Sequence, residues 1–300
     1  ALCAVLRQKV PLLAGWGRRY GCVKKQVNTG LDLCGGISMA RGKLAIVRGG
    51  GDLATGIIYR LWKVGYSVLS LETERPLAIR RTVSVASAVF DGSIVIEDME
   101  AVRIDSLSDL PRDREKVYVY VDPAGKSIAA LKPDLLVDAI MAKKNLGTRK
   151  GMAPLVIAIG PGFSAPEDVD AVIETKRGHY LGRVIRKGSA IPNTGIPGII
   201  KGYSVERVLR SPCDGYVVPL KSIGDTVMPE EAVACVEGVP VFSQIEGIVR
   251  GLIHPSVRVT KGLKIGDIDP RGEREHCFSI TDKALAIAGG VLEAIMSSEI

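Results

Sequence analysis

A run of three glycines directly after an apolar segment constrains this chain more than any other feature. Leu44-Ala45-Ile46-Val47 predicts a buried strand, and Leu53 to Val64 has the apolar spacing of a helix. Between them, Gly49-Gly50-Gly51-Asp52-Leu53-Ala54 fits the pattern G-x-G-x-x-G/A, which joins a strand to a helix in phosphate-binding turns. Tyr66 to Leu71 predicts the next strand. The segment therefore predicts a βαβ unit with parallel strand pairing.

The glycine turn predicts a site for a nucleotide-like phosphate. Small residues let the backbone approach the ligand, and the helix N-terminus offers unpaired N–H groups. Glu72 lies 23 residues after Gly49, near where an acid that binds ribose is expected. The alternative is a tight turn that binds nothing. The negative charge of Asp52 opposes phosphate binding unless its side chain points away from the ligand. The predicted cofactor-binding residues here are Gly49, Gly50, Gly51, Ala54, Gly56 and Glu72.

The alternation of strands and helices continues to about residue 160. Strands are predicted at 93–96, 117–121, 135–139 and 155–159, with a short helix at Ser127 to Leu131. We therefore expect residues 39–165 to form a doubly wound, Rossmann-like α/β domain. Residues 166–205 are rich in Gly and Pro and predict a β connection, with Lys176-Arg177-Gly178 as a hairpin turn.

An internal repeat with an offset of 32 residues characterises segment 206–272. Asp214-Gly215 corresponds to Glu246-Gly247, and Val227 corresponds to Val259. The pattern resembles a biotinyl/lipoyl-like barrel-sandwich hybrid. Because no lysine occurs from Ser222 to Thr260, we expect no covalent biotin or lipoate. Residues 273–300 predict a C-terminal helix, in which Gly289-Gly290 indicates close packing against another element.

Residues 1–38 differ from the rest of the chain. They carry six basic residues against one acidic residue, which leaves only +2 of the net charge of +7 to the remainder. The first methionine is Met39, so we interpret 1–38 as a non-native or disordered extension, with a genuine flexible arm as the alternative. The remainder lacks a basic stripe with aromatics and any long apolar run, so neither a nucleic-acid nor a membrane partner is expected. Isolated cysteines favour a cytoplasmic location.

A second candidate cluster follows the strand predicted at 155–159. Gly160 and Gly162 would lie at the carboxyl edge of the sheet, where ligands bind in open α/β folds. Glu174, Arg177 and His179 place an acid, a cation and an imidazole near one loop, which suits acid–base work. The alternative for His179 is a hydrogen-bonded turn residue. Arg183 is added to the cofactor-binding candidates. No metal-binding set is expected.

The three arginines Arg75, Arg80 and Arg81 follow the predicted strand that ends near Glu72. They could meet an anionic ligand or lie on a solvated loop, and the sequence leaves both open.

Several of these segments together resemble one known family. The segments are Ile46 to Gly56, Glu72 to Val83, Gly160-Pro161-Gly162-Phe163, Val172 to Arg183, Asp267 to Gly272 and Asp282-Lys283-Ala284. They are similar to the YqeB family of accessory proteins for selenium-dependent molybdenum hydroxylases. The resemblance implies a role in maturation of such hydroxylases, which are of the xanthine dehydrogenase type, and makes the hydroxylase a partner.

The anionic cofactor of such hydroxylases suggests a hypothesis about the ligand of the glycine turn. A molybdopterin-type cofactor or nucleotide would place its phosphate on Gly49, Gly50 and Gly51, with Arg177, His179 and Arg183 toward the pterin or metal. The alternatives are an NAD(P)-dependent oxidoreductase that uses the glycine turn and a pure interaction module that docks through the β-sandwich. Catalysis and homo-oligomer formation are left open by these residues.

Overall fold

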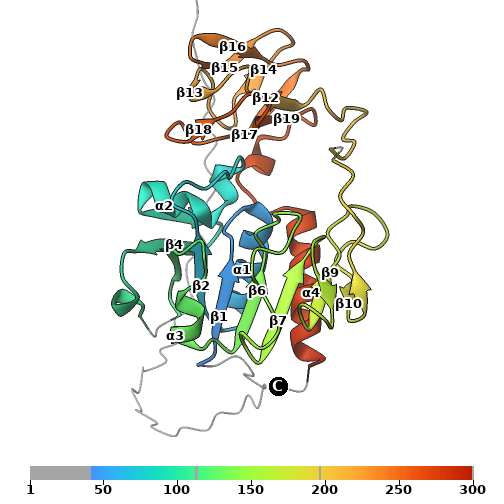
Figure 1. Ribbon diagram of the computed structural model, residues 1–300. Coiled ribbons are helices and arrows are strands. Elements are labelled where there is room, and N and C mark those ends of the chain that lie inside the picture. The colour runs from blue at the N-terminus through green and yellow to red at the C-terminus, as the bar shows by residue number, and fades with distance from the viewer. Residues whose placement is uncertain (1–41, 112–113, 196, 299–300) are drawn as a thin grey trace, which may run out of the picture. The chain divides into compact units, whose positions relative to one another are not determined.

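The computed structural model describes residues 42–111, 114–195 and 197–298. The prediction for residues 1–38 lies outside these ranges. The chain divides into two units, Ala1–Ile37 and Ser38–Ile300, and all of the following concerns the second. Its described residues form a nine-stranded sheet, a two-stranded sheet and two four-stranded sheets (Figure 1).

The nine-stranded sheet has the order β10-β9-β7-β6-β1-β2-β5-β4-β3. Its inner strands are parallel, whereas β3 and β10 pair antiparallel to their neighbours at the two edges. The strands are β1 (Leu44–Arg48), β2 (Ser67–Glu72), β3 (Ser93–Ile96), β4 (Met99–Ile104), β5 (Val117–Val121), β6 (Leu135–Asp138), β7 (Leu155–Ile159), β9 (Ala171–Ile173) and β10 (Val184–Ile185).

The predicted βαβ unit is confirmed. Strand β1 leads through helix α1 (Asp52–Lys63) to β2, and the two strands pair in parallel. The strands predicted near residues 93, 117, 135 and 155 are present, as is helix α3 (Ser127–Leu131). The hairpin predicted around Arg177 joins β9 to β10, which extends the sheet beyond residue 165. β8 (Ser164–Ala165) and β11 (Gly188–Ser189) form the two-stranded sheet.

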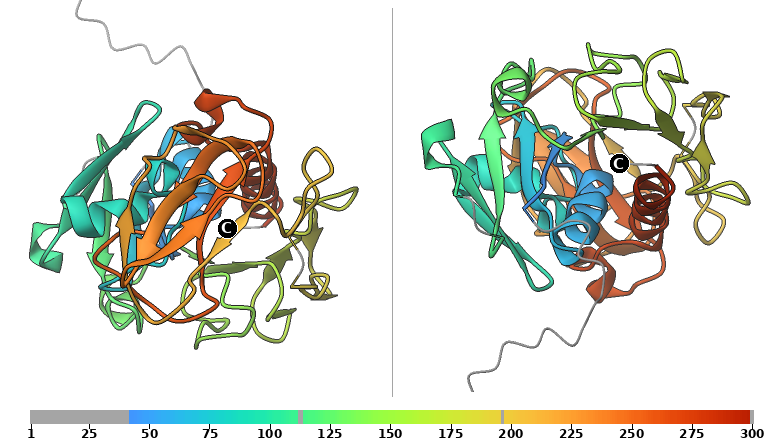
Figure 2. Two further views of the ribbon diagram at one scale, coloured as in Figure 1. Left: turned by 90° about the horizontal axis from the view of Figure 1, so that it is seen from above. Right: turned by 90° about the horizontal axis from the view of Figure 1, so that it is seen from below.

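The prediction of a doubly wound, Rossmann-like domain is wrong. The two long helices, α1 and α4 (Asp282–Met296), pack against each other over one face of the sheet, side by side in Figure 2. The other face is covered by α3 and by loops that contribute Phe163 and Ala190. No helix connects β6 to β7 or β7 to β9. A mixed sheet with both long helices on one face is therefore the correct description of the described residues; α2 (Ala88–Asp91) is a single turn.

Helix α4 packs closely, as its glycines indicated. A Cβ atom on Gly290 would lie 2.1 Å from the carbonyl oxygen of Gly182, whereas one on Gly289 would have no neighbour within 4 Å. A Cβ atom on Gly56 of α1 would lie 2.7 Å from Ala284 Cβ. These contacts bring the first turns of α1 and α4 together, which matters for the candidate site below.

The 32-residue repeat appears directly in the strands of the remaining two sheets. Their orders are β12-β19-β17-β14 and β16-β15-β13-β18. Strands β13, β14 and β15 start 32 residues before β17, β18 and β19, respectively. The strands are β12 (Val208–Arg210), β13 (Gly215–Pro219), β14 (Thr226–Val227), β15 (Ala232–Val236), β16 (Val239–Phe242), β17 (Gly247–Leu252), β18 (Arg258–Val259) and β19 (Lys264–Asp269).

The description of this segment as biotinyl/lipoyl-like is nevertheless wrong. Strands β12 and β16 correspond to each other at the same offset, because residues 208–210 map to residues 240–242 within β16, and each forms an edge of one sheet. The β15–β16 hairpin, where a carrier would present its lysine, ends in Glu237-Gly238. Glu237 folds back, and its Oε1 accepts a hydrogen bond from the Tyr216 backbone N–H at 3.1 Å. The tip is therefore held against β13 and presents no carrier side chain.

Asp269 is the most tightly paired carboxylate of this segment. It is 1% exposed and accepts hydrogen bonds from Arg250 Nη1 at 2.9 Å and Arg271 Nη2 at 2.6 Å. Burial alone would raise its pKa, but the hydrogen bonds from Arg271 and the charges of Arg250 and Arg271 lower the pKa to about 2. These two ion pairs join β17, which carries Arg250, and β19, which carries Asp269, to the segment after β19 that leads to α4.

We expect Asp269 to make the protein sensitive to acid. Because its pKa is lower in the folded state, its stabilisation is present above about pH 4 and is lost as the pH falls from about 4 to 2. The loss should amount to about 2 kcal/mol. Urea unfolding at a series of pH values should give a flatter profile for Asp269→Asn than for the wild type, and the exposed Asp105→Asn should follow the wild type. Parallel profiles for all three would contradict the assignment.

No helix among the described residues has the length and apolar character needed to cross a membrane.

Candidate functional site

The carboxyl ends of five parallel strands bring four predicted site residues, and Asp138 in addition, to one edge of the sheet. Gly49 follows β1, Glu72 ends β2, Asp138 ends β6, Gly160 follows β7 and Glu174 follows β9. Because the strands are parallel, these positions share the same edge, which Figure 1 shows above the strands β1, β6 and β7.

Two backbone N–H groups of the glycine turn are already hydrogen-bonded within the protein. Gly49 has a φ of 97°, and its N–H donates to the Leu71 carbonyl at 2.8 Å. The Gly50 N–H donates to Glu72 Oε1 at 2.6 Å. Burial raises the pKa of Glu72, and its hydrogen bonds with Thr73 and Gly50 oppose that change. Glu72 thus binds a backbone N–H of the glycine turn, whereas the sequence predicted that it would bind a ribose.

The N-terminus of α1 remains open beyond Gly50. Its N-cap is Gly51, so no side chain caps the helix, and a Cβ atom on Gly51 would have no neighbour within 4 Å among the described residues. Helix α4 differs, because Thr281 Oγ1 accepts a hydrogen bond from the Ala284 N–H at 3.1 Å. An uncapped N-terminus leaves N–H groups and a partial positive charge available to an anion.

Ala54 and Gly56 have a packing role in α1. Ala54 is 1% exposed, and Gly56 contacts Ala284 of α4. Neither faces the open space in front of Gly51. Their small size instead lets the two helix N-termini approach each other.

Asp52 does not leave an unpaired negative charge at this turn. Its Oδ2 lies 3.4 Å from Arg80 Nη1. Arg80 is largely buried, and its Nη2 also donates to the His276 carbonyl at 2.8 Å. Arg81, its neighbour, donates through Nε to the Leu252 carbonyl of β17 at 2.7 Å. These two arginines are therefore structural links between the turn, β17 and the segment before α4.

Lys283 is a site residue that the sequence analysis did not select. It is the second residue of α4, is half-buried, and forms no ion pair with any described residue. Burial lowers its pKa; the charges of Asp52 and Glu174 oppose this, and that of Arg177 adds to it. Its neighbour Ala284 packs against Gly56, so Lys283 lies on the part of α4 that approaches α1. Its only sequence signal was the segment Asp282-Lys283-Ala284.

The predicted catalytic residues Arg177 and Glu174 are occupied by structural contacts. Arg177 forms a double hydrogen bond with Asp282, at 2.8 and 3.2 Å. Glu174 is 2% exposed, and its two oxygens accept hydrogen bonds from the backbone N–H groups of Lys176 and Ile191, at 2.7 and 2.8 Å. Arg177 thereby ties the β9–β10 hairpin to α4, and Glu174 ties it to the chain at Ile191.

His179 and Arg183 lie on the same β9–β10 hairpin, and both side chains are exposed. The His179 ring packs edge-on to Tyr180, with 5.0 Å between ring centroids. The Arg183 guanidinium lies 5.1 Å from the centroid of Tyr180. No described carboxylate hydrogen-bonds to the His179 imidazole, so the structure provides it with no partner for acid–base catalysis.

The described residues form no group of three or more His, Cys, Asp or Glu side chains that could hold a metal ion. The carboxylates at the edge are all engaged: Asp52 and Asp282 with arginines, Glu72 and Glu174 with backbone N–H groups. Lys283 is positive and unpaired. The arrangement can therefore bind an anion.

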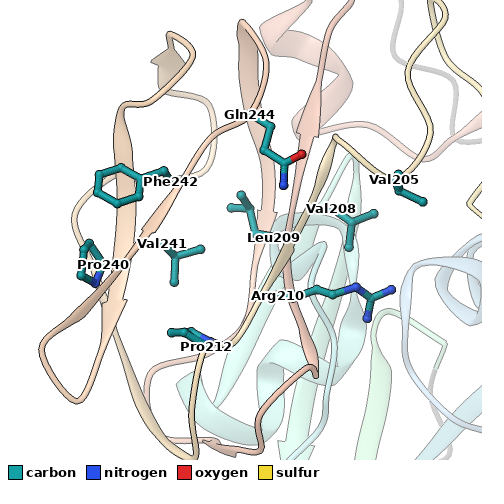
Figure 3. Close-up of a pocket in the computed structure, with 9 residues that line it drawn as sticks. All are labelled: Val205, Val208, Leu209, Arg210, Pro212, Pro240, Val241, Phe242 and Gln244. Carbon is teal, nitrogen blue, oxygen red and sulfur yellow. The ribbon is translucent and has the colours of Figure 1, made fainter.

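A groove of about 480 Å³ lies elsewhere in the molecule. Figure 3 shows its lining, with β12 residues on one side and β16 residues on the other. Phe242 and Pro240 are among its apolar members, and Arg210 and Gln244 are its polar ones. None of its lining residues belongs to the nine-stranded sheet, so the groove is separate from the candidate site.

With this geometry established, comparison with known proteins identifies one curated relative. The chain is 46% identical over 256 residues to the uncharacterized protein YqeB of Escherichia coli strain K12, an alignment that covers 85% of the chain. This likeness supports membership of the YqeB family. The chain spans about half of that relative, since the alignment covers 47% of it. No protein-family model matches.

Solved structures show only distant likeness. An aspartoacylase family protein from Mesorhizobium loti is 11% identical, with 76% of this chain and 86% of that chain covered and a TM-score of 0.25. A succinylglutamate desuccinylase/aspartoacylase from Rhodobacter sphaeroides is 9% identical, with 76% and 85% covered and a TM-score of 0.24. Such low scores carry no argument about activity.

Proposed function

We propose that this chain takes part in the maturation of selenium-dependent molybdenum hydroxylases and holds the phosphate of a molybdopterin-type cofactor at the edge of its sheet. The observation that carries the proposal is the combination of an uncapped α1 N-terminus, open space in front of Gly51 and an unpaired Lys283 at the start of α4, where the neighbouring Ala284 packs against Gly56 of α1. The maturation pathway comes from the sequence resemblance, and the anion site comes from this geometry.

The residues fit the phosphate of such a cofactor. N–H groups at a helix N-terminus and a lysine ammonium are both common phosphate ligands. The nearby carboxylates do not oppose an anion strongly, because Asp52 is paired with Arg80 and Asp282 with Arg177. When bound, the cofactor would supply the redox-active metal centre of the hydroxylase. The part of this chain would be to hold its phosphate and to keep it oriented.

Cellular maturation is the direct test of this role. In a host that makes a selenium-dependent molybdenum hydroxylase, deletion of the gene for this protein should leave the hydroxylase polypeptide at normal abundance but inactive. Elemental analysis of the purified hydroxylase should then show depleted molybdenum or selenium. Full metal and selenium content together with full activity in the deletion strain would refute the proposal.

Lys283 provides the biochemical test. Loss of one charged hydrogen-bond donor should weaken binding of molybdopterin cytosine dinucleotide about tenfold or more in Lys283→Met. Lys187→Met, which removes an exposed lysine on another loop, is the matched control and should bind like the wild type. Titration by calorimetry measures both. Equal affinity of Lys283→Met and wild type, or binding of NADPH alone, would count against the site.

A further inference from the structure

The sheet β16-β15-β13-β18 carries apolar side chains on the face that points away from the core of the sandwich. Val217 and Val236 pair with each other and point into that core, so their neighbours Val218 and Cys235 point outward. Cys235 in turn pairs with Pro240 of β16, which completes an apolar row across three strands. We call this surface the outer face; its apolar residues are Tyr216, Val218, Leu220, Cys235, Pro240 and Phe242. Since the solvated face of an antiparallel sheet is usually polar, an apolar outer face indicates an interaction surface.

The 32-residue repeat contains this face twice, and its second occurrence is covered. Val218 corresponds to Arg250 of β17, and Cys235 corresponds to Asp267 of β19. Arg250 and Asp267 are only 8% and 5% exposed. The short 3₁₀ helix Arg274–Cys277 (η4) packs on β17 there. The fold therefore uses this face for docking in one half of the repeat and leaves it open in the other half, with apolar residues in place of charged ones.

The amount of apolar surface on the outer face fits an interface between two chains. Tyr216, Val218, Leu220 and Phe242 are each about half exposed, between 44 and 54%. Together with Cys235 and Pro240 they present roughly 500 Å² of apolar surface. A standard interface takes about 800 Å² from each partner, and in homodimers about 65% of that area is apolar, which is nearly the same amount.

Two charges of opposite sign lie at opposite corners of the outer face. Arg258 of the edge strand β18 pairs with Tyr216 at the start of β13. Glu230 lies near the other edge strand, β16, because its N–H donates to the carbonyl of Ser243, directly after Phe242, at 2.8 Å. Both are exposed, and neither forms an ion pair with any described residue. Opposite charges at exchangeable positions make a surface complementary to itself, as an isologous interface requires.

We propose that the outer face binds a second copy of this chain and forms a twofold-symmetric dimer. The twofold axis runs parallel to the sheets and between the two charged corners, so that the apolar rows of the two copies pack face to face. Arg258 of each copy then lies opposite Glu230 of the other copy. The dimer does not depend on the proposed phosphate site, which lies at the edge of the nine-stranded sheet.

Sedimentation velocity of the full chain over a range of concentrations tests the proposal. The wild type should sediment as a dimer at micromolar concentration. Val218→Lys should raise the dimer dissociation constant about 100-fold or more, because each copy would bury an unpaired ammonium. Val95→Lys, the same substitution at a 65% exposed position of β3, is the matched control and should dimerise like the wild type.

Exchange of the two corner charges tests the arrangement without altering the apolar centre. Arg258→Glu and Glu230→Lys should each weaken the dimer at least about tenfold, because each places like charges opposite one another twice. An equimolar mixture of these two variants should dimerise like the wild type, since every such contact again joins opposite charges. Both residues are exposed, so the thermal unfolding of each variant should stay close to that of the wild type.

Three results would overturn the inference. The first is a wild type that stays monomeric, and the second is a dimer whose dissociation constant is unchanged by Val218→Lys. The third is a mixture of Arg258→Glu and Glu230→Lys that associates no more tightly than either variant alone.

Discussion

Replacement of Gly290 by alanine should destabilise the protein by about 2 to 3 kcal/mol, although alanine is the better helix former. The new Cβ atom would lie 2.1 Å from the Gly182 carbonyl oxygen and 2.8 Å from Ile173 Cγ2. Neither neighbour can rotate away, because one is backbone and the other belongs to a fully buried residue of β9. The helix must therefore move off the sheet. Urea unfolding measures the change.

The adjacent glycine is the matched control. Gly289 is exposed, and a Cβ atom there would meet nothing within 4 Å. Gly289→Ala should therefore stabilise the protein by up to about 1 kcal/mol through helix propensity alone. The two substitutions are chemically identical and one residue apart, so an equal effect of both would contradict the placement of α4 against the hairpin.

Replacement of Arg48 by methionine should cost about 3 to 5 kcal/mol, the largest effect expected of any single substitution discussed for this protein. Arg48 is 2% exposed, and its Nη1 lies 3.7 Å from Asp138 Oδ2. Its guanidinium also donates to Thr148 Oγ1 and to the Pro123 carbonyl, at 2.7 and 3.1 Å. Removal of the cation would leave a buried carboxylate without a charge partner, which urea unfolding at neutral pH should detect.

The pH dependence of the Arg48→Met variant provides a second measurement. Burial raises the pKa of Asp138, while Thr148, Ile140 and Arg48 oppose that rise. Without Arg48 the pKa should rise further. A carboxyl whose folded pKa is raised loses stability as the pH increases through that pKa, so the variant should be most stable in mild acid.

An exposed ion pair controls for the loss of a cation as such. Lys116 pairs with Glu100 at 3.0 Å, and both side chains are about 40% exposed. Lys116→Met should therefore cost less than about 1 kcal/mol. An Arg48→Met cost equal to that of Lys116→Met would show that the buried network of Arg48, Asp138 and Thr148 does not stabilise the fold.

Local pattern was sufficient for the elements near the site. The apolar run before Gly49, the helical spacing from Leu53 and the second apolar run at Tyr66 predicted β1, α1 and β2, because each depends on neighbours in sequence. The same holds for the 32-residue repeat and for the hairpin at Arg177. The close packing indicated by Gly289-Gly290 was confirmed for Gly290 alone, since spacing along a helix does not tell which of two adjacent glycines faces a partner.

Long-range pairing decided what the residues at the edge of the sheet do. The doubly wound prediction failed because a strand pattern does not report whether the connection to the next strand is a helix or a loop, and here β6 to β7 is a loop. Glu72 accepts a hydrogen bond from a backbone N–H of the turn, and Gly160 and Gly162 pack against the loop of residues 139–148 that follows β6. Neither contact is encoded in local spacing.

The sequence by itself determined that a glycine turn joins a buried strand to a helix, because glycine and apolar spacing act over a few residues. Tertiary structure alone decided which groups surround that turn. Lys283 lies 232 positions after Gly51, and its helix approaches α1 only because Gly56 and Ala284 let α1 and α4 touch. Asp52 is neutralised only because Arg80 folds back to it. The charge that an incoming ligand meets therefore depends on helix packing, which no short stretch of the chain specifies.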